Sequence, residues 1–500
     1  MRPPLKAVRG SEFPPGFQWL NTDAPLRLSD LRGRLVLLSF FTSSCINCRH
    51  ILPDLRRLNE QFGDALVIIG VHSGKFDAER DLENVRAAVA RLGISYPVVN
   101  DPDMELWQKY RIGAWPTLVL VGPNGRIVLE RPGEAAYRPL ADAVTAVLRD
   151  AEQADMLRTE PLPAPPPEPD APTDGPLLFP AKVHADEASG LLAIADAGHN
   201  RIVIANAEGE VVDVAGTGEA ALQDGSFDAA CFASPRGLTI EGTVVYVADT
   251  DNHALRRLDL RRRVVERIAG TGEQPSAWVA GGSGTRVALN SPWDIVVLRN
   301  YLYITMSGSH QIWRMDVRSG YIEAYIGSGH GALRDGTRAT AALAQPTGLT
   351  TDGIRLVFVD SDASAVRWAN LPPGNAVDTY VGAGLYEFGD RDGAARSALL
   401  QHPTGIAYYA GDLFVSDTCN NRVKRLNPRS ARIETLLGTG ERGDRDGEAA
   451  AFNHPSGMSA AGGRLFVADT NNHAIRTASV DGGAVKTLRL HPEERLLSGR

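Results

Sequence analysis

The stretch LVLLSFFTSSCINCRHILPDLRRLNEQF, residues 35–62, decides how the first part of the chain folds. It opens with the continuous apolar run Leu35–Phe41, which is typical of a strand buried on both faces. Apolar side chains then recur at helical spacing from residue 45 to residue 62, and this pattern predicts a helix. The two cysteines Cys45 and Cys48 therefore stand where a buried strand gives way to the start of a helix.

Strand and helix signals alternate outside that stretch. The Gly-Pro-Asn-Gly turn at residues 122–125 indicates that the last two strands form a hairpin. Alternation of this kind predicts a mixed sheet with helices on both faces. The sequence predicts further strands at 66–71, 98–99, 117–121 and 127–130, and further helices at 77–92 and 140–151.

The spacing of Cys45 and Cys48 suits thiol–disulfide chemistry. Two cysteines three positions apart on a first helical turn can close a disulfide with little backbone movement, and the start of a helix favours the thiolate at the first sulfur. Because the thiolate is the attacking species in exchange, we expect Cys45 to be the nucleophile and Cys48 to resolve the mixed disulfide. Arg49 and His50 follow directly, and they either lower a thiol pKa or face water.

Half of a zinc site is the other interpretation of a Cys-x-x-Cys pair. Residues 1–156 hold no second Cys/His pair at ligand spacing, so we expect no metal and no cofactor there.

At this point the front part resembles the thioredoxin superfamily, especially its TlpA-like and peroxiredoxin-like branch. The aromatic lead-in at residues 40–45 and Pro53, eight positions after the first cysteine, match that family. Trp115, Pro116 and Thr117 match its cis-proline loop. The resemblance implies that this loop lies against the dithiol and binds the backbone of a substrate.

The front part also departs from the family pattern. Ser39 stands where many thioredoxins carry a buried acid that assists the resolving thiol. Thr42 fits half of a peroxiredoxin pattern, but Leu38 replaces its proline, so a peroxidase stays an alternative. His72 follows the predicted strand 66–71, where it is either a packed side chain or a proton donor.

The second half of the chain repeats itself. Each repeat holds about four short strand signals, together with Gly-x-Gly and Pro-x-Gly motifs, and six such units predict a six-bladed β-propeller. A basic residue in three repeats, at Arg256, Lys424 and Arg476, is expected to reach a carboxylate of a neighbouring blade. The repeats align at positions 52–57 residues apart, namely Asp196, Asp249, Met306, Asp360, Asp417 and Asp469.

The turn after each aligned position resembles the NHL repeat, as in Asn252-His253-Ala254 and Asn472-His473-Ala474. The whole chain resembles the NHL-repeat-containing protein 2 family, with a thioredoxin-like α/β domain at 1–156 and a proline-rich linker at 157–176. The propeller follows at 177–490 and a tail at 491–500. The resemblance implies a cytoplasmic protein of cell redox homeostasis whose propeller binds a protein partner.

The sequence thus predicts a thiol–disulfide oxidoreductase that acts on a protein disulfide or thiol. Besides the peroxidase, two other functions stay open. The chain could be a redox-inert scaffold, or the propeller channel could hold a metal on its repeated histidines, His253, His310 and His473. Cys231 and Cys419 fit small packed sites in the propeller.

Composition and charge argue against several other classes of protein. The chain has 52 Lys and Arg against 60 Asp and Glu, a net charge of −8, which argues against a nucleic-acid surface. It contains no run of 18 apolar residues, so we expect no membrane span. The first 20 residues lack the apolar region of a secretory signal, and we therefore expect a cytoplasmic protein.

Overall fold

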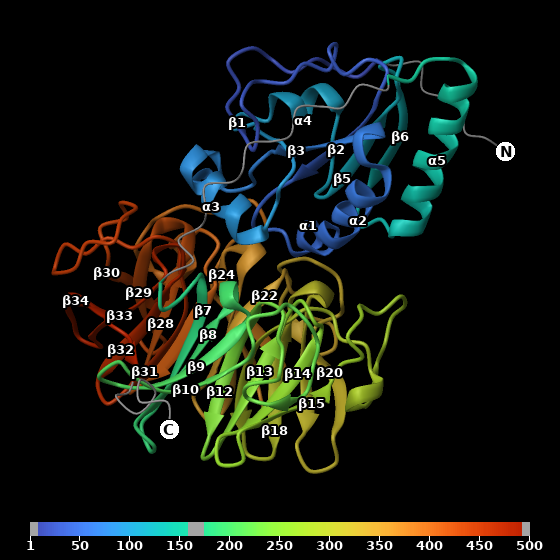
Figure 1. Cartoon of the computed structure of the whole chain (residues 1–500). Helices are drawn as coiled ribbons and strands as arrows, with labels where there is room; N and C mark the ends of the chain where they lie inside the picture. The colour runs from blue at the N-terminus through green and yellow to red at the C-terminus, as the bar shows by residue number, and fades with distance from the viewer. Residues whose placement is uncertain (1–8, 159–174, 493–500) are drawn as a thin grey trace. The chain divides into compact units, whose positions relative to one another are not determined.

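The computed structural model describes residues 9–158 and 175–492. The chain divides into two compact units, residues 1–171 and residues 172–500, and each is described by itself (Figure 1). Most of the predicted linker, residues 159–174, and most of the predicted tail, residues 493–500, lie outside the described residues.

The first unit is built on one six-stranded sheet of order β1-β4-β3-β2-β5-β6. β2, β3 and β4 run parallel, whereas β5 is antiparallel to β2 and forms a hairpin with β6. This is the mixed sheet of the thioredoxin-like fold that the sequence predicts. The strands are β1 Trp19–Leu20, β2 Leu35–Phe41, β3 Leu66–His72, β4 Val98–Asn100, β5 Thr117–Val121 and β6 Ile127–Pro132.

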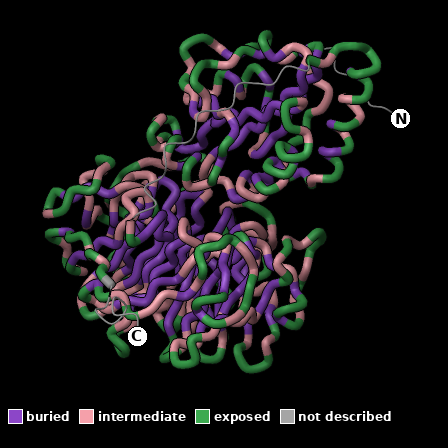
Figure 2. Tube along the Cα trace, in the orientation of Figure 1, coloured by how far each residue is buried: buried purple, intermediate pink, exposed green. Residues whose placement is uncertain are grey.

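Helices cover both faces of this sheet. The core on one face receives side chains of α1, α2, α3 and α5, and the core on the other face receives α4 and the N-terminal segment. Figure 2 shows the buried chain running along the strands. Within the described residues, no helix is both long and apolar enough to cross a membrane. The helices are α1 Ile46–His50, α2 Leu52–Phe62, α3 Leu82–Leu92, α4 Glu105–Tyr110 and α5 Tyr137–Gln153, with single turns η1 Gly63–Ala65 and η2 Asp77–Arg80.

The continuous helix predicted over residues 45–62 is wrong in one respect, because it is interrupted at Ile51. Proline has no backbone N–H, so Pro53 cannot donate a helical hydrogen bond. The series of helical backbone hydrogen bonds begins again with Leu55 N, which donates to Ile51 O at 3.0 Å. The predicted helix 77–92 likewise begins as a separate turn, and α3 starts only after Asp81 caps it.

The second unit is a ring of six antiparallel four-stranded sheets within residues 175–492 (Figure 1). The first strands of neighbouring blades pack on one another, β31 on β7 included, so the ring is closed and the predicted six-bladed propeller is confirmed.

Each blade has four consecutive long strands. Blade one is β7 Pro180–Asp186, β8 Leu191–Asp196, β9 Arg201–Asn206 and β10 Glu210–Ala215; blade two is β12 Pro235–Glu241, β13 Val244–Asp249, β14 Ala254–Asp259 and β15 Val264–Ala269; blade three is β17 Pro292–Leu298, β18 Tyr301–Met306, β19 Gln311–Asp316 and β20 Tyr321–Ile326. Blade four is β22 Pro346–Thr351, β23 Arg355–Asp360, β24 Ala365–Asn370 and β25 Ala376–Val381; blade five is β27 Gly405–Tyr409, β28 Asp412–Asp417, β29 Arg422–Asn427 and β30 Arg432–Leu437; blade six is β31 Pro455–Ala461, β32 Arg464–Asp469, β33 Ala474–Ser479 and β34 Gly482–Leu488.

Short fifth strands extend the outer edges of five blades. Four of them come from the connection that precedes the blade, whereas β35 His491–Pro492 runs parallel to β10 and joins the end of the chain to blade one. The other four are β11 Gly225–Ser226, β16 Gly281–Ser283, β21 Gly336–Thr337 and β26 Gly393–Ala394.

One hydrogen bond recurs between successive blades. The last residue of the turn between the second and third strands has a positive φ, and its side chain accepts a backbone N–H from the start of the next blade. His473 closes the ring by accepting from Phe179 N at 3.0 Å. The repeated histidines therefore link blades. The other five acceptor–donor pairs are Asn200–Ser234, His253–Ser291, His310–Gln345, Ser364–His402 and Asn421–His454.

The buried basic residues pair within their own blade, which corrects the predicted reach to a neighbour. Arg256 bonds Asp249 on β13 at 2.8 Å and Asp224 at 2.9 Å. Asp224 precedes β11, whose strand belongs to the same sheet as β14. The prediction failed because the sequence pattern assigns the connecting segment to the previous blade. The equivalent cations are Arg367, Lys424 and Arg476.

Candidate functional site

Cys45 stands at the beginning of α1, directly after the loop that follows β2. It is the N-cap residue of this helix, and its side chain is half-buried. Its Sγ lies 3.8 Å from the carbonyl oxygen of Trp115. The first cysteine therefore keeps partial access to solvent beside a backbone group of a second loop.

Cys48 lies one turn further along α1 and is buried at 4% exposure in the core under the helix. Burial raises the pKa of its thiol well above the ordinary value, and the hydrogen bond and the charge of Cys45 add to the rise. The two sulfurs thus differ in the way that an attacking and a resolving thiol differ, with one accessible and the other enclosed.

The loop before β5 lies against Cys45. The Trp115–Pro116 peptide bond is cis, and the indole Nε1 of Trp115 donates to Ser73 O at 2.9 Å. The Trp115 ring packs on Trp107, with 4.4 Å between ring centroids. Thr117 is buried on β5, its hydroxyl donates to Ala114 O at 2.7 Å, and it pairs with Phe40 on β2 and Pro132 on β6. The structure thus brings the predicted loop and the dithiol together.

A carboxylate that the sequence analysis missed holds the loop in front of Cys45. Glu79, on η2, is 5% exposed and accepts hydrogen bonds from the hydroxyls of Thr42 and Ser43 at 2.6 and 2.7 Å. It also accepts from the backbone N–H groups of Ser44, Lys75 and Phe76 at 2.9–3.0 Å. These bonds, with the charge of His72, lower the pKa of Glu79 to about 2 against the opposing effect of burial.

No sequence signal distinguishes Glu79. It lies 34 residues after Cys45 in the charged run Phe-Asp-Ala-Glu-Arg-Asp, whose pattern is that of an exposed helix end. Only the fold brings the turn after β3 under the loop after β2, where these two strands lie side by side.

The other predicted residues of this unit have defined surroundings. His50 is paired through Nδ1 with Glu134 at 2.8 Å, and His72 is fully buried at the end of β3. Ser39 is buried on β2. The Thr42 hydroxyl is committed to Glu79 in the interior, so it does not offer the peroxide-positioning contact of the peroxidase alternative.

The propeller offers the channel alternative little support. Lys182 on β7 and Asp294 on β17 form a buried ion pair at 2.6 Å between the first strands of blades one and three. Among the described residues, no group of three or more His, Cys, Asp or Glu side chains is arranged to hold a metal ion. Cys231 is buried beside Thr217 Oγ1 at 3.2 Å, and Cys419 is half-buried.

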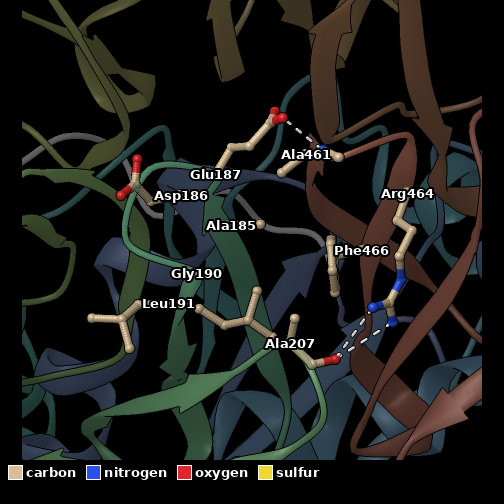
Figure 3. A pocket seen from close by; sticks show the side chains of 11 residues that line it. Ala185, Asp186, Glu187, Gly190, Leu191, Ala207, Ala461, Arg464 and Phe466 are labelled. Carbon is tan, nitrogen blue, oxygen red and sulfur yellow. Dashed lines mark hydrogen bonds between the residues drawn. The ribbon is translucent and has the colours of Figure 1, made fainter.

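A small pocket of about 170 Å³ lies where blade six meets blade one (Figure 3). Its walls include Ala185 and Phe466, and two hydrogen bonds join the blades beside it. Glu187 accepts from Gly462 N at 3.2 Å, and the Arg464 guanidinium donates to the carbonyl of residue 207 at 3.4 Å. This pocket belongs to the seam of the ring.

Comparisons with known proteins agree with the two-part architecture. The family described as thioredoxin-like matches residues 33–127, and the NHL repeat matches residues 452–477. Protein SUPPRESSOR OF QUENCHING 1, chloroplastic, from Arabidopsis thaliana is 40% identical over 94% of this chain, which spans 47% of that protein. NHL repeat-containing protein 2 from Homo sapiens is 36% identical over 97% of this chain and 72% of its own length. Thiol-disulfide oxidoreductase ResA from Bacillus subtilis is 27% identical over 21% of this chain and 55% of its own.

Proposed function

The chain belongs to the NHL repeat-containing protein 2 family, and from the geometry of its dithiol we propose that it acts as a thiol–disulfide oxidoreductase. Cys45 attacks a disulfide of a protein substrate, and Cys48 then resolves the mixed disulfide and closes the Cys45–Cys48 bond. The observation that carries this proposal is the contrast between the half-buried Cys45 at a helix start and the enclosed Cys48 one turn behind it.

The loop of Trp115, Pro116 and Thr117 is proposed to hold the substrate backbone. Support comes from the position of the Trp115 carbonyl, 3.8 Å from the attacking sulfur. A substrate strand on this loop would bring its disulfide next to Cys45 without displacing a packed side chain, because Trp115 is itself anchored to Ser73 and Trp107.

The test is disulfide reduction by the full chain. With dithiothreitol as reductant, the wild type should accelerate insulin reduction, and Cys45→Ser should return the rate to that of dithiothreitol alone. Cys419→Ser is the matched control, because it removes a half-buried cysteine of the propeller and should leave the rate unchanged. Equal rates for wild type and Cys45→Ser would eliminate the proposal in favour of the redox-inert scaffold.

The propeller is proposed to bind the protein partner. Its most exposed aromatic side chains, Trp278 at 76% and Tyr386 at 71%, both lie on connections between blades. The Cys48→Ser background traps the mixed disulfide between Cys45 and the partner. In that background, Trp278→Ser should lower the yield of trapped partner, whereas thiol–disulfide exchange between Cys45 and insulin should continue. An unchanged yield would remove Trp278 from the partner surface.

The cytoplasmic location belongs to the same proposal. A dithiol that reduces its substrate needs a compartment that keeps it reduced, and the cytoplasm does so. The Arabidopsis relative is named chloroplastic, so microscopy of a tagged chain is the direct check.

A further inference from the structure

A buried carboxylate lies behind the loop that meets Cys45. Asp101 follows β4, and its side chain is fully buried at 0% exposure. It accepts hydrogen bonds from the hydroxyl of Ser73 at 2.7 Å and from the backbone N–H groups of Leu106 and Trp107 at 3.0 Å. In the described part of the chain Asp101 forms no ion pair. Because a carboxylate buried without a cation is costly, this one calls for an explanation beyond packing.

Two separate routes lead from Asp101 to Trp115. Ser73, whose hydroxyl donates to Asp101, offers its own carbonyl oxygen to the indole Nε1 of Trp115 at 2.9 Å. Trp107, whose backbone N–H donates to the same carboxylate, lies on α4. Its ring packs on that of Trp115, with 4.4 Å between the ring centroids. The side chain of Trp115 is therefore held by two neighbours, and Asp101 is hydrogen-bonded to both of them.

The backbone of Trp115 stands next to the attacking sulfur. Its carbonyl oxygen lies 3.8 Å from Cys45 Sγ, and its backbone N–H has no hydrogen-bond partner among the described residues. An N–H and a carbonyl oxygen of one residue are the two groups through which an extended peptide adds itself to a chain as a further strand. Trp115 thus offers a polypeptide two backbone contacts beside Cys45.

We propose that Asp101 is a positioning residue for polypeptide disulfides, which fixes the backbone of Trp115 beside Cys45 through Ser73 and Trp107. This inference rests on the proposed function. In the step concerned, the Cys45 thiolate attacks one sulfur of the substrate disulfide and forms a mixed disulfide. The substrate S–S bond breaks, and its other sulfur leaves as a thiolate with the electron pair of that bond. Asp101 gives and takes no proton or electron here, and its effect is on the orientation of the substrate chain.

The same arrangement predicts which disulfides depend on Asp101. A polypeptide that lies along the loop is oriented by a fixed Trp115, whereas 5,5′-dithiobis(2-nitrobenzoate) has no peptide group to bind there. Loss of Asp101 should therefore slow attack on a protein disulfide and spare attack on this small disulfide. The ratio of the two rates separates positioning from a general loss of structure, because a damaged fold slows both reactions.

The test compares the two disulfides on one protein. The full chain carries Cys231→Ser and Cys419→Ser, so that only the dithiol reacts. Reduced protein is mixed with excess insulin or with excess 5,5′-dithiobis(2-nitrobenzoate), and the rate constant of the first attack is measured for each. Asp101→Ala should lower the rate constant with insulin about tenfold, the scale of one or two weakened hydrogen bonds, and change that with the small disulfide by less than about twofold.

Two milder variants test the route through Ser73. Trp115→Phe removes the indole N–H and keeps a ring that packs on Trp107. Ser73→Ala removes the hydroxyl that donates to Asp101. Each should lower the rate constant with insulin in the same direction by a smaller factor, and each serves if Asp101→Ala does not fold. Asp81→Ala is the matched control, because it removes a carboxylate that accepts a backbone N–H at the start of α3, whereas Asp101 does so on α4.

The outcomes are distinct. An equal loss with both disulfides would show that Asp101 only supports the fold, and no loss with insulin would show that the loop needs no such support. Either result overturns the proposal. If the unsubstituted protein and Cys45→Ser reduced insulin at the same rate, the proposed function itself would fail, so the two failures are distinguishable.

Discussion

The two units use buried polar groups in different ways. In the propeller, one link between blades occurs six times, with a His, Asn or Ser side chain accepting the same backbone N–H. In the thioredoxin-like unit, Glu79 gathers five donors at a single place. A contact that recurs in every blade produces a periodic pattern in the sequence and tolerates a change of residue type between blades. A contact that is made once produces no such pattern. Substitutions in both units should sharpen this contrast.

The largest effect on stability should come from removing one buried cation of the propeller. Arg256→Met leaves the fully buried Asp249 with only Asn252 and a backbone N–H as partners. Removing one partner of a buried ion pair destabilises a protein by about 3–5 kcal/mol, and we expect a loss of that size in denaturant unfolding of the full chain. Burial raises the pKa of Asp249 to about 6 although Arg256 lowers it, so removal of Arg256 raises this pKa further, and the deficit should shrink as the pH falls toward 6 and the carboxyl of the variant takes up a proton.

Blade three supplies the control for that prediction. It carries Met306 and a buried Trp313 where blade two carries Asp249 and Arg256. The double variant Asp249→Met, Arg256→Trp copies this apolar pair and should be less destabilised than Arg256→Met alone, because no buried charge is left unpaired. A double variant less stable than the single one would show that the ionic pairs are not interchangeable with packing.

Glu79 should have the next largest effect, and its effect should depend on pH in a more acidic range than that of Asp249. Its pKa is lowered from 4.5 to about 2 in the folded chain, so its contribution is fully present above about pH 4.5 and is lost as pH falls toward 2. A shift of this size corresponds to about 3 kcal/mol. Hydrogen exchange of the β3 amides should therefore accelerate between pH 5 and pH 3 in the wild type beyond the intrinsic pH effect.

Glu79→Gln should remove that pH dependence and raise exchange already at neutral pH. Glu134→Gln is the control, since Glu134 is more exposed and pairs only at the surface with His50. A wild-type profile that does not change between pH 5 and pH 3 would contradict the lowered pKa. The same Glu79→Gln variant should slow attack by Cys45, because the loop of Thr42 and Ser43 loses its anchor.

How much the sequence could predict follows the same division. The six repeats predicted the propeller, and the apolar strand before Cys45 with the helical spacing after it predicted that this cysteine stands at the start of a helix. The resemblance of Trp115, Pro116 and Thr117 to the cis-proline loop of the thioredoxin superfamily implied that this loop lies against Cys45, as it does. Glu79 could not be predicted, because its donors in residues 42–44 lie 35–37 positions away and its own surroundings in sequence are ordinary. The break at Ile51 is a local effect of Pro53 that apolar periodicity does not register.

The carboxylates that pair with Arg256 were predicted to lie in a neighbouring blade, but they lie in its own blade. The reason is related. Periodicity locates a repeat but does not decide which sheet a connecting segment joins. That choice is made by the pairing of β11 with β15, where two residues form the strand. Weak local signals of this length are set by tertiary context.

The smallest effect should come from the ring-closing link. His473→Ala leaves the Phe179 N–H without its side-chain acceptor and should cost about 1 kcal/mol, the scale of one hydrogen bond. His253→Ala removes the equivalent link to Ser291 between blades two and three. Because blades one and six are joined by the two-residue strand β35 and not by a connection that runs from one blade into the next, hydrogen exchange near Phe179 should rise more than exchange near Ser291.

The repeat itself provides the rescue. Asn200 and Asn421 make the same link through a side-chain oxygen, and asparagine tolerates the left-handed conformation that His473 adopts at a φ of 54°. His473→Asn should therefore restore protection at Phe179, whereas His473→Ala should not. Burial lowers the pKa of His473, so Nδ1 stays an acceptor at neutral pH, and the wild-type link should weaken only in acid, while the amide link of the His473→Asn variant should not. Equal protection in the alanine and asparagine variants would mean that β35 on β10 and the packing of β31 on β7 hold the ring closed without this hydrogen bond.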